Sequence, residues 1–298
     1  MVTSNEATRW WSAFGRDPGE LTEVRTVTSG ASGSAVYRLH TKDSELVLKV
    51  TTRRELSVYR DLGPRLPVVL PRLVAGIEGG DRACLLLEAA GVPSKDPERW
   101  NDLAGQLGEL HHDRIATAAA DWSLAKPEQS ERESEVVAAI QFWTAFGYDR
   151  LPEFDKLNAA LAELPPCLRH GDWHLGNLLL DASDRFVWID WQEAGFGRGP
   201  EDLALLWQRA EFDGLAPPRE AMLAAYARAR EIPDDAILRR ATAAAELTLL
   251  LLSWPAYLAG APEAARARLL RRLEHLIQGW QSGSAASRPR GRRARRGS

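Results

Sequence analysis

The stretch that decides the fold is His170-Gly171-Asp172-Trp173-His174-Leu175-Gly176-Asn177, followed by Val187-Trp188-Ile189-Asp190. Three polar side chains stand out in it: Asp172, Asn177 five residues later, and Asp190 thirteen residues after that. The residues at 177–180 and 186–190 are typical of the two arms of one β-hairpin, with a turn at 181–184. Because a hairpin brings its two ends together, we expect Asn177 and Asp190 to lie close in space.

These side chains suit one kind of chemistry. An amide oxygen and a carboxylate form a good pair of hard oxygen ligands for Mg²⁺ beside phosphates. Asp172 lies just upstream in a glycine-flanked loop, where it is free to accept a proton from a substrate hydroxyl. In phosphoryl transfer an Asp positions the nucleophile, while an Asn and a second Asp hold the metal. The order His170, Asp172, Asn177 and then Asp190 is also that of a kinase catalytic loop and its metal-binding Asp.

The amino-terminal part favours β-strands. Short runs rich in Val, Leu and Tyr predict strands at 23–29, 35–40, 45–50 and 82–88, and a short helix at 53–62. In the third run Leu46, Leu48 and Val50 share one face, while Val47 and Lys49 point to the other.

A glycine-rich turn and a lysine complete the candidate site. The turn Ser29-Gly30-Ala31-Ser32-Gly33-Ser34 joins the first two strands, and its backbone N–H groups at Gly30, Ser32 and Gly33 could approach phosphates closely. Lys49 on the following strand can reach nucleotide phosphates, and Glu55 at the start of the next helix can hold that lysine by an ion pair. Taken singly, these are an ordinary turn and a solvated lysine. Their order along the chain favours the functional interpretation.

After Glu88 the pattern becomes helical. Leucine stripes at helical spacing, such as Leu103, Leu107 and Leu110, predict core-facing helices up to about residue 280. We therefore predict an α+β protein, with a small antiparallel sheet and one helix followed by a larger, mainly helical part. The expected divisions are a nucleotide-binding lobe at 1–88, a helical lobe with the catalytic loop and substrate pocket at 89–280, and a flexible basic tail at 281–298.

Composition sets the broad class. The 298 residues are 45% hydrophobic and 27% charged, which excludes a mainly disordered or fibrous chain. The net charge is −3, so no nucleic-acid footprint covers the whole molecule. Six arginines crowd the last eleven residues and carry +6, so the rest of the chain carries −9. The tail suits a weak contact with an anionic surface or nucleic acid, or it is a solvated terminus without a role.

The cellular setting follows from what the sequence contains. Cys84 and Cys167 make neither a disulfide framework nor a metal finger, so a reduced, cytoplasmic location is expected. The amino terminus does not read as a signal peptide. The most apolar stretch, at 247–252, is too short to span a bilayer and predicts a core helix, so we expect no membrane partner.

The sequence resembles the aminoglycoside phosphotransferase family, which is related to choline kinase and shares the two-lobe protein-kinase-like fold. The similarity covers about residues 22–207 in motif order. Its strongest matches are the catalytic loop from His170 to Asn177 and Ile189-Asp190-Trp191. Further matches are Glu201-Asp202-Leu203-Ala204, Leu110-His111-His112 and Leu85-Leu86-Leu87-Glu88.

That resemblance implies a role for each residue. Asp172 would be the catalytic base, and Asn177 and Asp190 would bind Mg²⁺. Lys49 would contact the phosphates of ATP or GTP, with Glu55 supporting it and the glycine-rich turn beside it. Glu88 would lie at the hinge over the adenine.

The resemblance also implies a small acceptor rather than a protein. Eleven residues separate Asp190 from Asp202, which leaves no room for a peptide-holding activation segment, and Asp190-Trp191-Gln192 replaces Asp-Phe-Gly. Helices inserted at 113–166 would form a small-molecule pocket. An antibiotic is the leading substrate, and a metabolite of the sugar, choline, ethanolamine or thiamine type is the alternative. A cationic hydroxylated substrate would suit four downstream carboxylates, which a solvated helical face explains equally well: Glu193, Glu201, Glu211 and Asp213.

Two other functions compete with this interpretation. His170, Asp172 and His174 alternate along the chain, and on an extended loop they could bind a transition metal in a hydrolase. That site would leave the spacing of Asn177 and Asp190 unexplained. The second alternative is a non-catalytic binding protein with a kinase fold, because fold alone does not prove activity. Retention of Lys49, Asp172 and Asp190 argues against it.

Overall fold

The computed structural model describes residues 5–27, 34–80, 82–93, 97–112, 129–258 and 260–286. The chain divides into two compact units. The first comprises residues 1–125, 166–210 and 216–234, and the second comprises residues 126–165, 211–215 and 235–298. This division differs from the expected boundary at residue 88, because the amino-terminal sheet and the catalytic loop fall within one unit.

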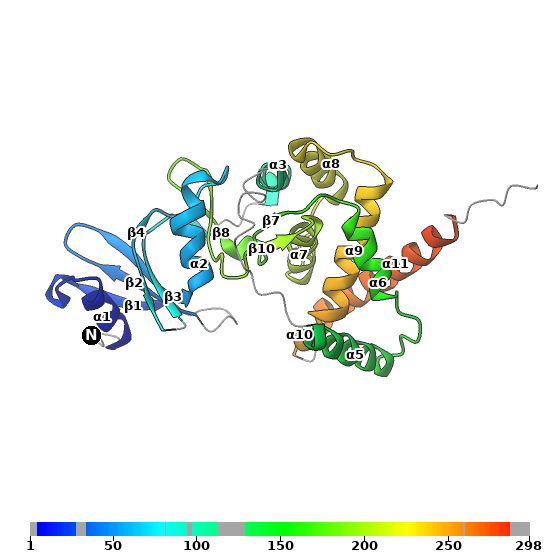
Figure 1. Cartoon of the computed structure of the whole chain (residues 1–298), viewed down its shortest axis with the longest axis horizontal. Helices are drawn as coiled ribbons and strands as arrows, with labels where there is room; N and C mark the ends of the chain where they lie inside the picture. Colours follow the sequence, from blue (N-terminus) through cyan, green and yellow to red (C-terminus); the bar gives the residue numbers. More distant parts are fainter. Residues whose placement is uncertain are drawn as a thin grey trace, which may run out of the picture. The chain divides into compact units, whose positions relative to one another are not determined.

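The first unit opens with a helix and a five-stranded antiparallel sheet (Figure 1). The sheet has the strand order β1-β2-β3-β5-β4. These elements are α1 (Asn5–Ala13), β1 (Glu23–Val27), β2 (Ala35–His40), β3 (Glu45–Thr52), β4 (Leu73–Gly79) and β5 (Arg82–Glu88). The expected strands are therefore confirmed within the described residues, and α1 and β4 are additions. Strand β4 lies at the sheet edge and carries a bulge between Leu73 and Ala75, which breaks the alternation that a sequence search relies on.

One face of this sheet is apolar and is covered by α1, whereas the other carries a charged side chain. On one face the side chains of Leu46, Leu48 and Val50 pack with Ala7 and Trp11 of α1 into a buried apolar cluster. The opposite face carries Lys49. The alternation expected for β3 is thus confirmed, and helix α1 is the cover that allows an alternating strand to bury its apolar side.

The expected helix at 53–62 is present but changes geometry halfway. It consists of α2 (Arg53–Ser57) and one π-helical turn, η2 (Val58–Leu62). Thr52 caps α2, since its side chain accepts a hydrogen bond from the backbone N–H of Glu55. The cap fixes where the helix begins and therefore where Glu55 lies.

The hairpin predicted from the sequence is confirmed and forms part of a small second sheet. Strands β8 (Leu178–Leu180) and β9 (Phe186–Trp188) pair antiparallel, with Leu178 opposite Trp188. The remaining strands of the unit are β6 (Val92–Pro93), which pairs with β8, and β7 (Cys167–Arg169) with its partner β10 (Gly195–Gly197). Its remaining α-helices are α3 (Trp100–His112), α7 (Pro200–Phe212), which ends in the second unit, and α8 (Arg219–Arg230). The short 3₁₀ turns are η1 (Pro18–Glu20), η3 (Gly63–Arg65), η4 (Pro97–Arg99) and η5 (Leu175–Asn177).

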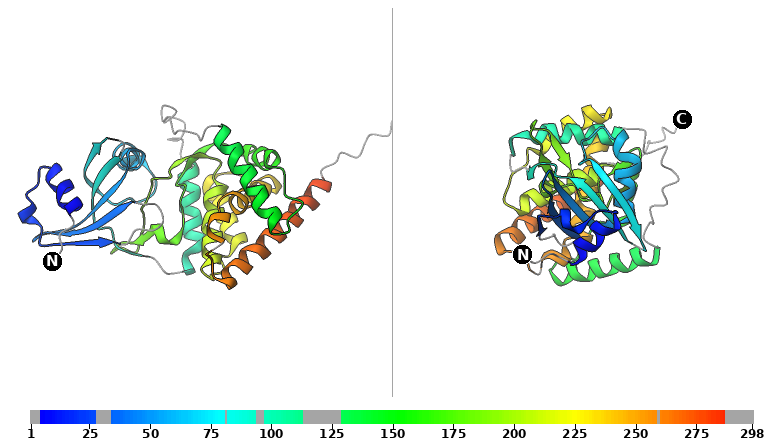
Figure 2. Two further views of the ribbon diagram at one scale, coloured as in Figure 1. Left: turned by 90° about the horizontal axis from the view of Figure 1, so that it is seen from below. Right: turned by 90° about the vertical axis from the view of Figure 1, so that its left-hand side faces the viewer.

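Helices alone form the described part of the second unit (Figure 2). They are α5 (Gln129–Ala145), α6 (Phe154–Ala162), α9 (Ala236–Leu252), α10 (Pro255–Leu258) and α11 (Glu263–Ala286). Helix α9 contacts each of the others, and it contains the apolar stretch at 247–252 that predicted a core helix. The fold is therefore α+β, with an antiparallel sheet near the amino terminus and a mainly helical remainder.

Parts of three sequence-based expectations lie outside the described residues. These are the glycine-rich turn with Gly30, Ser32 and Gly33, residues 113–128 of the expected insertion, and residues 287–298 of the expected tail. Helix α11 continues to Ala286, so the tail expected from residue 281 begins as helix. Across the described ranges, no helix combines the length and the apolar character needed to cross a membrane.

The packing of α1 on the sheet predicts a stability effect. Leu86 in β5 is fully buried in the cluster beneath α1, and its removal leaves a cavity. We expect Leu86→Ala to lower the free energy of unfolding by about 2–5 kcal/mol. Val92, which is 65% exposed, is the matched control, and Val92→Ala should change that free energy by less than about 0.5 kcal/mol. Urea unfolding followed by circular dichroism measures both; equal effects would contradict this packing.

Candidate active site

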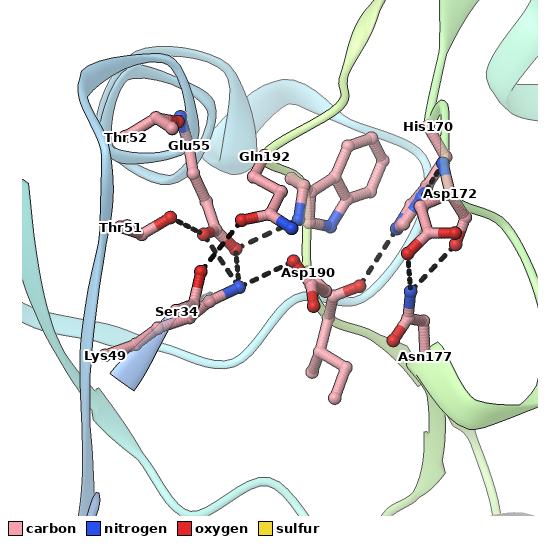
Figure 3. A network of polar contacts seen from close by, with 12 residues as sticks. Ser34, Lys49, Thr51, Thr52, Glu55, His170, Asp172, Asn177, Asp190 and Gln192 are labelled. Atoms are coloured by element: carbon pink, nitrogen blue, oxygen red, sulfur yellow. Dashed lines mark hydrogen bonds and ion pairs between the residues drawn. The ribbon is translucent and has the colours of Figure 1, made fainter. Parts of the chain in front are cut away.

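A buried lysine lies at the centre of the candidate site (Figure 3). Lys49 projects from β3 and is only 6% exposed. Its Nζ donates hydrogen bonds to Glu55 Oε1 at 2.9 Å and to Asp190 Oδ1 at 2.7 Å. The structure therefore brings together three predicted site residues from β3, α2 and the end of the β8–β9 hairpin.

The Glu55 carboxylate is held by two further contacts. Its Oε2 accepts from Thr51 Oγ1 at 2.6 Å, and its Oε1 accepts from the backbone N–H of Trp191 at 3.0 Å. The carboxylate is 0% exposed, yet each of its oxygens has donors. A buried charge is tolerated only when it is paired and hydrogen-bonded in this way.

The charges around Lys49 keep it protonated. Burial by itself would lower the pKa of Lys49, but the facing carboxylates of Glu55 and Asp190 outweigh that effect and raise the pKa. The ammonium is therefore a permanent positive charge at neutral pH. Its Nζ lies within 2.9 Å of three carboxylate oxygens, two of Glu55 and one of Asp190, so an anionic ligand would share its three N–H donors with them.

The catalytic-loop residues Asp172 and Asn177 contact each other directly. Asn177 Nδ2 donates to the backbone oxygen of Asp172 at 2.8 Å and to its Oδ2 at 3.0 Å. His174 Nε2 lies 3.6 Å from the same Oδ2, while its Nδ1 accepts the N–H of Gly176. Burial would raise the pKa of Asp172, but the hydrogen bonds from His174 and Asn177 outweigh it and the pKa is lowered. Asp172 is thus a carboxylate at neutral pH.

The hairpin brings Asn177 next to the Asp190 segment, as the sequence predicted. The backbone N–H of Ile189 donates to the carbonyl of Asn177 at 3.0 Å. Asp190 has a φ of 66°, a left-handed conformation that is uncommon outside glycine. The chain therefore turns sharply at Asp190, directly after the hairpin, where its carboxylate meets Lys49.

Buried Asp202 holds the backbone of the catalytic loop. Its two carboxylate oxygens accept the N–H groups of His170 at 2.8 Å and of Gly171 at 3.0 Å, and His111 Nε2 lies 3.3 Å from Oδ2. Burial alone would raise the pKa of Asp202, but the hydrogen bond with His111 and the nearby Arg169 charge outweigh it and lower the pKa. Asp202 therefore stays ionised, and its charge fixes the start of the loop.

Gly171 satisfies a steric requirement at that point. It has a φ of 86°, and a Cβ there would lie 2.0 Å from the backbone oxygen of Glu193. Only glycine meets both conditions, which explains the Gly before Asp172.

The side chains of Asn177 and Asp190 each keep an oxygen atom that could bind Mg²⁺. Asn177 turns its amide nitrogen to Asp172, which leaves its Oδ1 for a ligand, and Asp190 offers its second carboxylate oxygen (Figure 3). Two hard oxygen donors from protein, completed by phosphate and water, fit Mg²⁺. Within the described ranges no group of three or more His, Cys, Asp and Glu side chains could hold a metal by itself.

The alternative transition-metal site does not form. His170 is fully buried, its Nε2 lies 3.0 Å from the carbonyl of Ile189, and its Nδ1 accepts the N–H of Asp172. Burial lowers the pKa of His170, so the ring is neutral and both nitrogens are used in holding the loop. His170 positions the backbone and is not a metal ligand, which removes the hydrolase interpretation.

Two further predicted residues, Glu88 and Glu201, lie near arginines and do not contact Lys49. The side chain of Glu88 forms an exposed ion pair with Arg72 and does not contact Lys49, and its backbone N–H donates to the carbonyl of Arg72 at 3.0 Å. Glu201, one of the four carboxylates considered for substrate binding, accepts the backbone N–H of Arg198 and lies 3.7 Å from Arg169. It is therefore a structural residue.

Some contacting residues were missed by sequence reasoning. Thr51, Ser34 and Gln192 each have a buried side-chain hydrogen bond within or beside this network. Ser34 and Gln192 are 158 positions apart, so no local pattern connects them. The only available signal was position, since Ser34 ends the glycine-rich turn and Gln192 follows Asp190 by two residues.

Comparison with known proteins supplies an independent observation. The family described as Phosphotransferase enzyme family matches residues 23–239. A comparison with curated protein sequences finds no match.

Solved structures show the same fold at low sequence identity. One is a Ralstonia eutropha protein assigned as an aminoglycoside phosphotransferase, with 15% identity, a TM-score of 0.61, and coverage of 95% of this chain and 98% of that chain. Another is the microcompartment-associated aminopropanol kinase, with 16% identity, a TM-score of 0.58, and coverage of 94% and 97%. A third is an aminoglycoside phosphotransferase in a ternary complex with ADP and hygromycin B, with 16% identity, a TM-score of 0.54, and coverage of 93% and 98%.

The loop anchor predicts a pH-dependent effect. We expect Asp202→Asn to lower the free energy of unfolding at pH 7 by about 1–3 kcal/mol, because buried loop donors lose a charged acceptor. The pKa of Asp202 in the folded protein is below its ordinary value. The difference in free energy of unfolding between wild type and variant therefore has its full size above about pH 4. It should shrink as the pH falls through the lowered pKa. Denaturant unfolding between pH 3 and 7 measures this, with exposed Asp213→Asn as control; a difference that grows in acid would contradict the assignment.

Proposed function

Since the chain belongs to the phosphotransferase enzyme family, we propose that it transfers the γ-phosphoryl group of ATP or GTP to a hydroxyl group of a small molecule. The family identifies the chain as a small-molecule phosphotransferase. One observation carries the finer proposal: Lys49 joins Glu55 and Asp190, while the adjoining loop presents Asp172 and Asn177 (Figure 3).

Each side chain of this network has a task in that reaction. Lys49 binds the nucleotide phosphates and keeps its charge because two carboxylates face it. Asn177 and Asp190 are the residues that would hold Mg²⁺, which when bound neutralises charge on the phosphates. Glu55 orients Lys49 without reaching the nucleotide, since it is fully buried.

Asp172 is the proposed base, and the structure distinguishes its two oxygens. Oδ2 accepts from Asn177 and faces His174, whereas no donor in the described ranges is bonded to Oδ1. We assign proton acceptance to Oδ1. The acceptor hydroxyl loses its proton to this oxygen as its own oxygen bonds to the γ-phosphorus and the bond to the leaving nucleoside diphosphate breaks.

For the acceptor we propose an antibiotic, with a metabolite of the sugar, amino-alcohol or thiamine type as the alternative. The acidic body of the chain, with net charge −9 apart from the six terminal arginines, favours a cationic hydroxylated compound. The similar solved structures include both aminoglycoside phosphotransferases and an aminopropanol kinase, so both classes belong in the test. Free, buried Cys84 and Cys167 support a reducing, cytoplasmic location.

Nucleotide turnover against a panel of hydroxylated compounds tests the proposal. Mg²⁺-dependent ADP and GDP release is measured with aminoglycosides, macrolides, peptide and nucleoside antibiotics, choline, thiamine and simple sugars. We expect acceptor-dependent release with one antibiotic class. Asp172→Ala should lower the rate of that release at least about 10³-fold while nucleotide still binds. Exposed Asp43→Ala, in the turn between β2 and β3, should retain full activity.

The outcomes separate the alternatives. Release confined to a common metabolite would make the enzyme metabolic. Normal turnover by Asp172→Ala would disprove the assigned base. Absence of nucleotide binding by the wild type would favour a non-catalytic binding protein.

Asp190 should affect nucleotide binding rather than proton transfer alone. Asp190→Ala removes a proposed Mg²⁺ ligand and a partner of Lys49, so we expect the Kd for Mg²⁺-nucleotide to rise by at least about tenfold. Binding of the nucleotide without Mg²⁺ should change much less. Isothermal titration with and without Mg²⁺ measures both, again with Asp43→Ala as control; equal losses in the two titrations would argue against a metal ligand at Asp190.

A further inference from the structure

Three consecutive residues, Asp190, Trp191 and Gln192, contact three different parts of the amino-terminal sheet region. The Asp190 carboxylate meets Lys49 in β3, and the Trp191 amide meets Glu55 in α2. The third contact is a hydrogen bond of 2.9 Å from Ser34 Oγ to Gln192 Oε1 (Figure 3). The reaction proposed above uses the first two contacts and leaves the third unexplained.

The third contact is buried and specific. Ser34 is 6% exposed and Gln192 is 7% exposed, so water does not readily replace either partner. Breaking such a bond leaves a buried polar group unsatisfied, which costs more than the bond itself gains. The pair is therefore a fixed connection between the chain before β2 and the residues that follow Asp190.

The position of Ser34 relates this connection to Lys49. In the β2–β3 ladder Val36 lies directly opposite Lys49, and paired residues on neighbouring strands project to the same face. Ser34 precedes Val36 by two residues, so its hydroxyl is on the Lys49 face, where Gln192 meets it. The contacts close a ring that runs from Ser34 along β2, across to Lys49, through Asp190 to Gln192 and back.

We infer that Ser34 and Gln192 are positioning residues for the Mg²⁺-nucleotide, an inference that rests on the proposed function. When phosphates bind, Lys49 redirects part of its hydrogen bonding from Asp190 to them. The Ser34–Gln192 bond is made by groups outside that exchange, so it keeps Asp190 against the sheet while the lysine is shared.

A double-mutant cycle tests this role. Ser34→Ala and Gln192→Met preserve most of the buried volume and remove the bond. Each should raise the Kd for Mg²⁺-ADP and for a Mg²⁺-bound non-hydrolysable ATP analogue by about three- to tenfold. The Kd of the double variant should not exceed that of the single variant with the higher Kd, because both substitutions remove the same hydrogen bond. The KM for the acceptor should be unchanged, which a general loss of structure would not permit.

The control is a buried hydroxyl with a purely structural bond. Thr242 Oγ1 donates to the carbonyl of Leu238 within helix α9, and Thr242→Val should leave the nucleotide Kd unchanged. Unchanged Kd values in both single variants, or additive effects in the double variant, would overturn the inference while wild-type binding still supported the proposed function. A wild type that binds no Mg²⁺-nucleotide would overturn both.

Discussion

A lysine ammonium buried between two carboxylates is the interaction on which the rest of the structure depends. Lys49 comes from the sheet, Glu55 from the helix after it, and Asp190 from a hairpin 141 residues further along. Removing charges from water is expensive, and the attraction between them offsets that cost only when the geometry is good and every remaining lone pair is satisfied. The Thr51 hydroxyl and the Trp191 amide donate to the Glu55 carboxylate and provide that satisfaction, while the Thr52 cap fixes where its helix begins. The same geometry leaves a protonated donor where phosphates can bind.

The loop from His170 to Asn177, which we propose as the catalytic loop, is held in place by groups of the protein itself. Its backbone is held by the Asp202 carboxylate, the neutral ring of His170 and the Ile189 amide, and its two functional side chains are bonded to each other. A site whose dipoles are already oriented does not spend free energy on reorganising during the reaction. The buried Ser34–Gln192 bond extends this arrangement to the start of β2. The network as a whole therefore favours positioning and electrostatics over covalent chemistry, as phosphoryl transfer requires.

Elements with a strong local signal were predictable from the sequence, and those that depend on partners were not. The alternation of β3 and the turn of the β8–β9 hairpin are local properties, and both are confirmed. Strand β4 escaped prediction because its bulge and glycines disturb the alternation. Helix α1 is short and gains its stability from packing Ala7 and Trp11 on the sheet, so the helix propensity of its residues does not predict it. The π-helical turn after α2 and the continuation of α11 to Ala286 likewise show no hydrophobic periodicity or capping residue that predicts them.

The sequence by itself determined the residue types of the site and their order, because phosphoryl transfer requires a carboxylate, an amide and a second carboxylate at spacings that a loop and hairpin can bring together. It also determined that Lys49 lies opposite the apolar face of its strand. Only the tertiary structure decided that Glu55 and Asp190 share this lysine and that Ser34 bonds to Gln192. It also decided that His170 holds the loop backbone and binds no metal. Glu88 pairs with Arg72 and Glu201 accepts the Arg198 N–H, and neither contact is visible in the sequence. The physical reason is burial, since the partner of a buried polar group is chosen by three-dimensional packing, and no spacing along the chain specifies it.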